Sequence, residues 1–222
     1  MTTNQSARSE IVALGRALYD RGITHGRTGN LSVRLGDRVL MTPTGMSLGR
    51  LSPDHLSVLD LAGTHISGDR PSKELELHRV YYERHPEVTA VAHVHSTHAV
   101  ALSCLAGLDE LQPLAPLTAY YVMRVGTMPL IGYFPPGDPQ LAQALRTAAP
   151  GARCALLANH GTIAAAGSLE AAVDAVEEIE ETARLTLLLH GRRLSLLSNE
   201  QVRALTDRAA GQGRGASPRE DR

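Results

Sequence analysis

The sequence predicts a single α/β domain in which helices cover a mixed or antiparallel sheet. Hairpin patterns fill the first half of the chain, and strands alternate with helices in the second half. No linker or internal repeat interrupts the chain before residue 211. The 222 residues are also enough to bury one large core, so one domain is expected rather than two.

Composition excludes several classes of protein. The chain has 22 Lys and Arg residues and 23 Asp and Glu residues, so its net charge is −1. It therefore has no excess of positive charge for binding nucleic acid or an anionic membrane surface. No apolar run approaches the roughly 20 residues that span a bilayer. Residues 1–15 do not resemble a signal peptide. Cys104 and Cys154 cannot form a disulfide framework, and reduced thiols fit the cytoplasmic location that we expect.

The first half of the chain is predicted to contain one helix and two hairpins. Apolar residues recur at helical spacing over residues 6–22. Residues 31–42 alternate as two strands around Gly36-Asp37, a two-residue turn that begins with the residue favoured in type II′. Residues 57–67 repeat this pattern as a second hairpin.

The second half alternates between helices and strands. Ser96, Asp138 and Ser168 are expected N-caps, and Ser198 with Gln201 forms a capping box. Helices are expected over residues 73–85, 97–107, 139–149, 169–190 and from 199, and strands over 88–95, 128–133, 153–158 and 162–167. Residues 108–127 are too aperiodic for a predicted element. The domain is expected to span residues 1–210, followed by a disordered Gly-rich tail at 211–222.

Histidines give the strongest chemical signal. The chain has ten, and His93 and His95 lie two residues apart on the predicted strand 88–95. Side chains at positions i and i+2 of a strand share a face, about 7 Å apart, so these rings can chelate one metal ion. The alternative is a pair of structural histidines in a polar patch. His98 is better explained as a cap or surface residue.

Further ligands are needed, because a catalytic zinc keeps three protein ligands and one open position. His160 is the best candidate, since it stands in a turn between two apolar strands; an ordinary turn histidine is the alternative. Glu74, expected in the first helical turn where the helix dipole favours an anion, adds a carboxylate. For Glu74 the alternative is a surface residue that complements the dipole.

Small and hydroxylated residues at turns indicate phosphate binding, because backbone N–H groups at such places can surround a phosphate. The chain lacks a Walker A or G-x-G-x-x-G pattern, so nothing indicates a nucleotide. Each turn taken alone is also compatible with a structural role. The turns are Thr28-Gly29-Asn30, Thr44-Gly45 and Ser72-Lys73.

Five ordered motifs together resemble the class II aldolase/adducin family. They read THGRTGNLSVR, MTPTG, DRPSKELELH, VAHVHSTHAVALS and ANHG, and the resemblance extends to about residue 205. The family includes L-fuculose-phosphate aldolase, L-ribulose-5-phosphate 4-epimerase and decarboxylases of 3-oxo-tetronate 4-phosphates. The resemblance implies a single three-layer α/β domain with a largely antiparallel central sheet. It also implies a homotetramer with active sites at subunit interfaces.

The resemblance assigns roles to individual residues. It implies one Zn²⁺ per subunit on His93, His95 and His160, with Glu74 as the catalytic acid/base and a further metal ligand in the resting enzyme. It places Tyr120 where the aldolase has a tyrosine near its active site. It implies that the substrate phosphate is held by Asn30, Thr44, Gly45 and Ser72. Lys73 departs from the serine of the aldolase and adds a positive charge beside the phosphate.

Lys73 and the segment TAYYVMRVGTMPLIGYFPPGD resemble the decarboxylase branch more than the aldolase. The expected function is therefore zinc-dependent decarboxylation of a 3-oxo-tetronate 4-phosphate to dihydroxyacetone phosphate and CO₂ in sugar-acid catabolism. The substrate is a small phosphorylated sugar acid, with no nucleic-acid or membrane partner. The alternatives are an aldolase that cleaves a ketose 1-phosphate, a pentulose-phosphate 4-epimerase and a non-catalytic adducin-like interaction domain.

Overall fold

Eight strands form one sheet at the centre of the computed structural model, which describes residues 3–214. Their order is β4-β3-β2-β1-β5-β8-β7-β6, and neighbours are antiparallel except for the parallel pair β6 and β7. The strands are β1 (Asn30–Leu35), β2 (Arg38–Met41), β3 (Ser57–Asp60), β4 (His65–Ser67), β5 (Ala90–Val94), β6 (Leu130–Ile131), β7 (Cys154–Leu157) and β8 (Gly161–Ala166).

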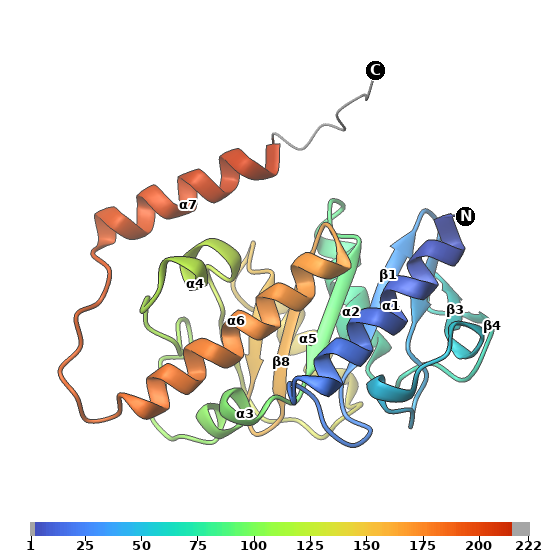
Figure 1. Ribbon diagram of the computed structural model, residues 1–222, viewed down its shortest axis with the longest axis horizontal. Helices are drawn as coiled ribbons and strands as arrows, with labels where there is room; N and C mark the ends of the chain where they lie inside the picture. Colours follow the sequence, from blue (N-terminus) through green and yellow to red (C-terminus); the bar gives the residue numbers. More distant parts are fainter. Residues whose placement is uncertain (1–2, 215–222) are drawn as a thin grey trace.

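Helices cover both faces of this sheet and make three layers (Figure 1). One apolar core lies between the sheet and α1, α3, α4 and α6, and a second lies between the sheet and α2 and α5. The predicted single three-layer α/β fold with a largely antiparallel sheet is therefore confirmed. The α-helices are α1 (Thr3–Asp20), α2 (Leu75–Arg84), α3 (Thr97–Ser103), α4 (Ala119–Arg124), α5 (Pro139–Thr147), α6 (Leu169–Leu188) and α7 (Asn199–Arg214).

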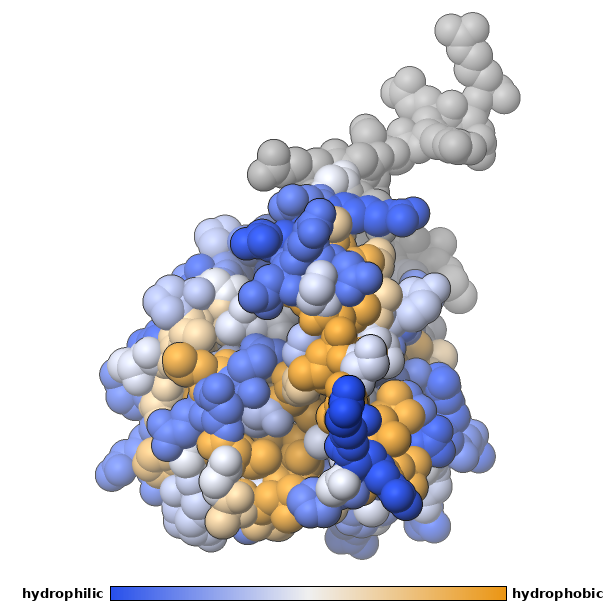
Figure 2. All heavy atoms as spheres, turned by 90° about the vertical axis from the view of Figure 1, so that its left-hand side faces the viewer, coloured by the Kyte–Doolittle hydropathy of each residue, from blue (hydrophilic) through white to orange (hydrophobic). Residues whose placement is uncertain are grey.

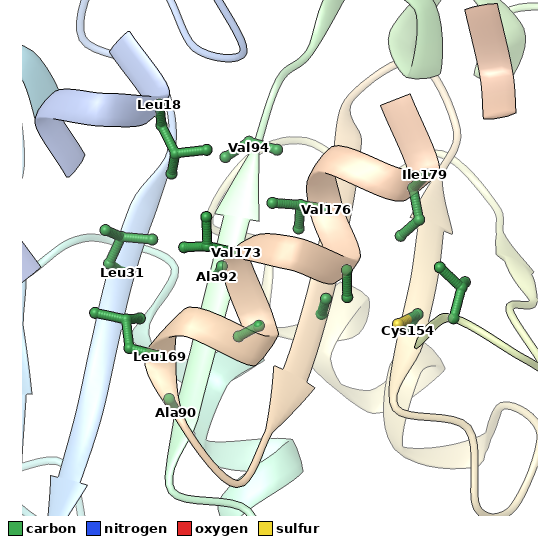
Figure 3. Close-up of a cluster of buried hydrophobic side chains, with 14 of the residues drawn as sticks. Leu18, Leu31, Ala90, Ala92, Val94, Cys154, Leu169, Val173, Val176 and Ile179 are labelled. Atoms are coloured by element: carbon green, nitrogen blue, oxygen red, sulfur yellow. The ribbon is translucent and has the colours of Figure 1, made fainter. Parts of the chain in front are cut away.

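Strand alternation sorts side chains between the two cores. In β5, Ala90, Ala92 and Val94 face the core under α6. Figure 3 shows Ala92 and Val94 near Val173 and Val176 of that helix. Val91 faces the opposite core, under α2 and α5. His93 is two residues further along and so shares the face of Val91.

Both predicted hairpins are present. β1 and β2 pair around Gly36-Asp37, and Gly36 has the positive φ of 62° that favours glycine. β3 and β4 form the second hairpin. The predicted capping box is also confirmed, because the Ser198 backbone N–H donates to Gln201 and the Gln201 N–H donates to the Ser198 hydroxyl.

Several local features differ from the prediction. Ser96 occupies the N-cap of α3, but its side chain makes no capping hydrogen bond. The Glu180 carboxylate on α6 instead accepts the N–H groups of His98 and Ala99. The aperiodic stretch 108–127 contains α4, which Thr118 caps through its hydroxyl.

At the C-terminal end, α7 lies apart from the sheet and contacts α4 (Figure 1). It continues to Arg214, so residues 211–214 are helical although a disordered tail was expected from residue 211. The remainder of that expected tail, residues 215–222, lies outside the described residues. No helix within the described range is long and apolar enough to cross a membrane.

Gly161 is required by a close approach between β8 and the end of β5. A Cβ atom there would lie 2.4 Å from the Val94 carbonyl oxygen. We expect Gly161→Ala to lower the free energy of unfolding by about 1–3 kcal/mol, because backbone must move to relieve the overlap. Urea denaturation of the metal-free protein measures this loss.

Gly167, just beyond the other end of β8, is the matched control. A Cβ atom there would lie 3.8 Å from the nearest heavy atom outside its chain neighbours, the Glu87 carbonyl oxygen. Gly167→Ala should change the free energy of unfolding by no more than about 0.5 kcal/mol. Equal stability of the two variants would contradict the steric explanation.

Candidate metal centre

Four potential metal ligands lie close together at one end of the central strands β5 and β8. They are Glu74, His93, His95 and His160. One ligand atom from each residue lies within 4.8 Å of the corresponding atoms of the other three. His93 and His160 are brought together because β5 and β8 pair as antiparallel neighbours. The structure thus assembles all four residues that the sequence and its family resemblance marked as candidate metal ligands.

The turn before β8 has an unusual backbone that presents His160 to the cluster. Asn159 adopts a left-handed conformation with φ of 54°, which asparagine tolerates better than most residues. The His160 backbone N–H donates to the Leu157 carbonyl and closes the turn. Gly161 then allows β8 to start against Val94, so the imidazole of His160 is held next to the His93 and His95 rings.

Glu74 is the N-cap of α2. The sequence had predicted it one step further along, in the first turn of that helix. Its carboxylate is buried. Oε2 lies 3.2 Å from His93 Nε2, and Oε1 lies 3.0 Å from His160 Nε2. Oε2 also accepts a 2.8 Å hydrogen bond from the Asn30 side-chain amide.

The hydrogen bond of His93 fixes which ring nitrogen is free. Nδ1 lies 2.8 Å from the Thr162 carbonyl oxygen, which can only accept, so Nδ1 carries a proton. In the neutral ring Nε2 is then a lone-pair donor, and it faces His95 Nε2 at 2.9 Å and the Glu74 carboxylate. Lone pairs this close repel unless a proton or a metal cation lies between them.

Charges within the cluster shift its pKa values in opposite directions. Burial raises the pKa of Glu74, but His93 and His160 outweigh it and hold that pKa far below its ordinary value. Burial lowers the pKa of His93, yet the Glu74 carboxylate outweighs burial and the net shift is upward. For His95, burial and the two neighbouring imidazoles lower the pKa to about 3. The cluster therefore favours an ionised carboxylate with a compensating cation.

The cluster fits a divalent metal ion. Glu74 Oε1 and both ring nitrogens of His160 are buried without a hydrogen-bond partner among the described residues, although His160 Nε2 approaches Oε1 to 3.0 Å. Separations near 3 Å between ligand atoms match an ion with bonds of about 2 Å to nitrogen and oxygen. Imidazole and carboxylate ligands suit zinc and other first-row transition metals.

A cavity of about 250 Å³ opens beside Glu74 and His95. An isolated antiparallel β-bridge between Pro43 and Pro71 connects two of the turns whose residues line the cavity. The residues expected to bind phosphate all line this cavity, namely Asn30, Thr44, Gly45, Ser72 and Lys73. The sequence interpretation missed Arg27, a second cationic lining residue, although it lies within the Gly-rich motif THGRTGN.

Tyr120 does not join the candidate site of its own chain. It lies on α4 with 62% of its side chain exposed, and the Arg124 guanidinium stands 5.3 Å from its ring centre. The described residues that line the cavity beside Glu74 do not include it.

The fold and the cluster define a three-layer α/β protein with a candidate metal centre at the sheet edge. Residues 9–187 match the family model described as "Class II Aldolase and Adducin N-terminal domain". The chain belongs to the class II aldolase and adducin family.

Known relatives share nearly the whole chain. A 3-oxo-tetronate 4-phosphate decarboxylase of Haemophilus influenzae is 48% identical over 93% of this chain and 99% of its own length. An L-fuculose phosphate aldolase of the same organism is 35% identical over 83% of this chain and 84% of its own. The crystal structure of YgbL from Escherichia coli superposes on this chain with a TM-score of 0.89. It has 41% identity and covers 92% of this chain and 100% of that one.

Metal analysis tests the centre directly. We expect the protein to bind one divalent ion per chain. His160→Ala should weaken that binding more than about 100-fold, because loss of a ligand exceeds the 10–100-fold cost of losing a supporting contact. Competition with a chromogenic chelator measures the dissociation constant. The exposed His65 provides the control, and equal affinities of His65→Ala and His160→Ala would remove His160 from the ligand set.

Proposed function

We propose that the protein is a zinc-dependent decarboxylase that converts a 3-oxo-tetronate 4-phosphate to dihydroxyacetone phosphate and CO₂. The cavity beside the Glu74 cluster supports this function most directly. Glu74 and His95 line one side of it, with His93 and His160 of the same cluster buried behind them, and the turns suited to phosphate line another side. The decarboxylase relatives, 43–48% identical over most of this chain, favour the same reaction.

The substrate phosphate fits the outer part of the cavity. Lys73 and Arg27 supply positive charge there, and the Ser72 hydroxyl and the Thr44-Gly45 turn supply polar groups. Holding the phosphate at this end places the carbon atoms of a short sugar acid toward Glu74 and His95. Binding energy from the phosphate can thereby orient the bond that breaks.

Loss of CO₂ leaves an electron pair that flows into the neighbouring ketone of the substrate. Zinc held by His93, His95 and His160 would act as a Lewis acid that stabilises this developing negative charge. The reaction consumes one proton, which the carbon that loses CO₂ takes up. Glu74 is placed to hold and deliver that proton. His93 and His160 hold the pKa of Glu74 far below its ordinary value, so the proton that Glu74 delivers must first reach it from solvent.

The runner-up is aldol cleavage of a ketose 1-phosphate, which passes through the same enediolate of dihydroxyacetone phosphate. The aldolase relatives, 34–35% identical to this chain, support that alternative. The reactions differ in what leaves, namely CO₂ or an aldehyde. Product analysis on both substrate classes therefore separates them.

Removal of the proton-carrying group tests the role of Glu74. We expect Glu74→Gln to lower kcat for decarboxylation by about 10²–10⁴-fold, since an amide cannot deliver the proton. A coupled assay for dihydroxyacetone phosphate, with CO₂ measured in parallel, gives the rate.

Glu76, exposed in the first turn of the same helix and paired with Arg79, provides the matched control. Glu76→Gln should keep kcat within about twofold, because exposed ion pairs contribute little. Full turnover by Glu74→Gln would rule out its acid role. Release of an aldehyde in place of CO₂ would favour the aldolase.

The exposed position of Tyr120 favours a role in the site of a neighbouring copy. Figure 2 shows apolar surface on the side of the molecule where the segment between α6 and α7 runs. Leu188, Leu194 and Leu196 of this region are exposed, and burial of such leucines favours association. We therefore include a homotetramer with active sites at subunit interfaces in the proposed function.

Mixed oligomers test this assignment. We expect Tyr120→Phe to lower kcat at least about tenfold, as for loss of an acid–base group. Co-expression with Glu74→Gln should restore activity, since some sites then combine an intact Glu74 with an intact Tyr120. Two differently tagged Tyr120→Phe chains, the more active of the two parent variants, give the background. Hybrids no more active than this background, or a monomer by light scattering, would contradict the shared site.

A further inference from the structure

A row of buried polar groups runs away from the metal centre between α2 and β1. Glu74, His78 and Tyr82 are spaced four residues apart, so they lie on one face of α2 and its N-cap. Asn30 and Ser32 alternate with Leu31 on β1, so they point to the face that α2 covers. All five side chains are buried.

Hydrogen bonds link these residues in a zigzag between helix and strand. Asn30 Nδ2 lies 2.8 Å from Glu74 Oε2, and Asn30 Oδ1 lies 2.6 Å from His78 Nε2. His78 Nδ1 lies 2.7 Å from the Ser32 hydroxyl. That hydroxyl lies 2.6 Å from the Tyr82 hydroxyl, which ends the row.

The Asn30 amide, whose Nδ2 donates to Glu74 Oε2, fixes the direction of every bond in this row. Glu74 only accepts, so the Asn30 amide donates to it and presents its carbonyl oxygen to His78. His78 must then donate from Nε2, which leaves Nδ1 to accept from Ser32. The Ser32 oxygen in turn accepts from Tyr82. Burial and the nearby His93 lower the pKa of His78 to about 3, so its ring is neutral, as this arrangement requires.

Burying so many polar groups is costly unless each finds a partner. Val91, on the neighbouring strand, and Leu77, on α2, show that apolar side chains fit this layer. The row therefore has a role that an apolar interface between α2 and β1 would not fulfil. Because the Asn30 amide cannot pass a proton along, that role is orientation rather than proton conduction.

We propose that His78 is a positioning residue, which fixes the orientation of the Asn30 amide and through it the carboxylate of Glu74. Ser32 and Tyr82 fix the ring of His78 in turn. The Glu74 carboxylate is thereby held both for the metal centre and for proton delivery. This inference rests on the proposed function for its catalytic consequence, but not for its effect on metal binding.

Three substitutions of His78 separate positioning from simple packing. The Gln amide reaches the place of Nε2 and can still donate to Asn30, whereas the shorter Asn amide reaches only the place of Nδ1. We expect His78→Asn and His78→Leu to lower kcat about 10–100-fold with KM nearly unchanged. His78→Gln should keep kcat within about threefold of the unmodified protein. Circular dichroism and thermal unfolding establish that each variant is folded.

Neighbouring tyrosines supply a matched pair at the far end of the row. Tyr82→Phe removes the last hydroxyl and should lower kcat about threefold, the effect of one hydrogen bond. Tyr81, the preceding residue, is also buried, but its hydroxyl has no hydrogen-bond partner in the described part of the chain. Tyr81→Phe should leave kcat unchanged.

Metal affinity gives a readout that needs no turnover. Competition with a chelator should show about tenfold weaker Co²⁺ binding by His78→Leu and His78→Asn, with recovery in His78→Gln. The inference is overturned if His78→Gln behaves as His78→Leu in both measurements, or if both tyrosine variants lose activity equally. If the unmodified, metal-loaded protein shows no decarboxylation, the proposed function fails, and the Co²⁺ affinities alone then decide the role of His78.

Discussion

The burial of one ionised carboxylate against three imidazoles is the constraint on which the site depends. A charge removed from water is strongly destabilising unless opposite charge and hydrogen bonds compensate it. Glu74 receives one hydrogen bond from Asn30 on Oε2. Its Oε1 has no hydrogen-bond partner among residues 3–214, although His160 Nε2 lies 3.0 Å away. His93 cannot turn to relieve the contact, because Thr162 holds its other nitrogen. A shared cation satisfies all of these groups at once.

The antiparallel sheet brings these groups to a single edge. β1 begins at Asn30, β5 ends at Val94 and β8 begins at Gly161, and neighbouring antiparallel strands place such ends side by side. Alternation along β1 and β5 then turns Asn30 and His93 toward α2, whose N-cap carries Glu74. The strand pairing that separates the two apolar cores therefore also positions the side chains of the candidate metal centre.

Local patterns were enough to predict the hairpins and the capping box, and they offered the four residues of the cluster as candidates that the family resemblance then joined into one ligand set. Other features depend on contacts that no local pattern contains. α4 has six residues, too few to show periodicity, and β6 has two, so its parallel pairing with β7 is set by packing. His78 lies within the predicted helix 73–85, and the helical pattern alone gives no sign of its partners. Its partners Asn30 and Ser32 become visible only once β1 is known to lie under α2.

The separation of charge types within the cavity suits decarboxylation. A cation paired tightly with the substrate carboxylate would stabilise the ground state and slow the loss of CO₂. Lys73 and Arg27 are exposed residues of the cavity lining, where water weakens ion pairs. In the proposed function they would contact the more highly charged phosphate rather than the substrate carboxylate. His95 also lines the cavity, and burial and the neighbouring imidazoles lower its pKa to about 3, so its ring is neutral there. Strong electrostatic stabilisation would therefore act at the metal centre, where negative charge develops on the substrate only as the bond to CO₂ breaks.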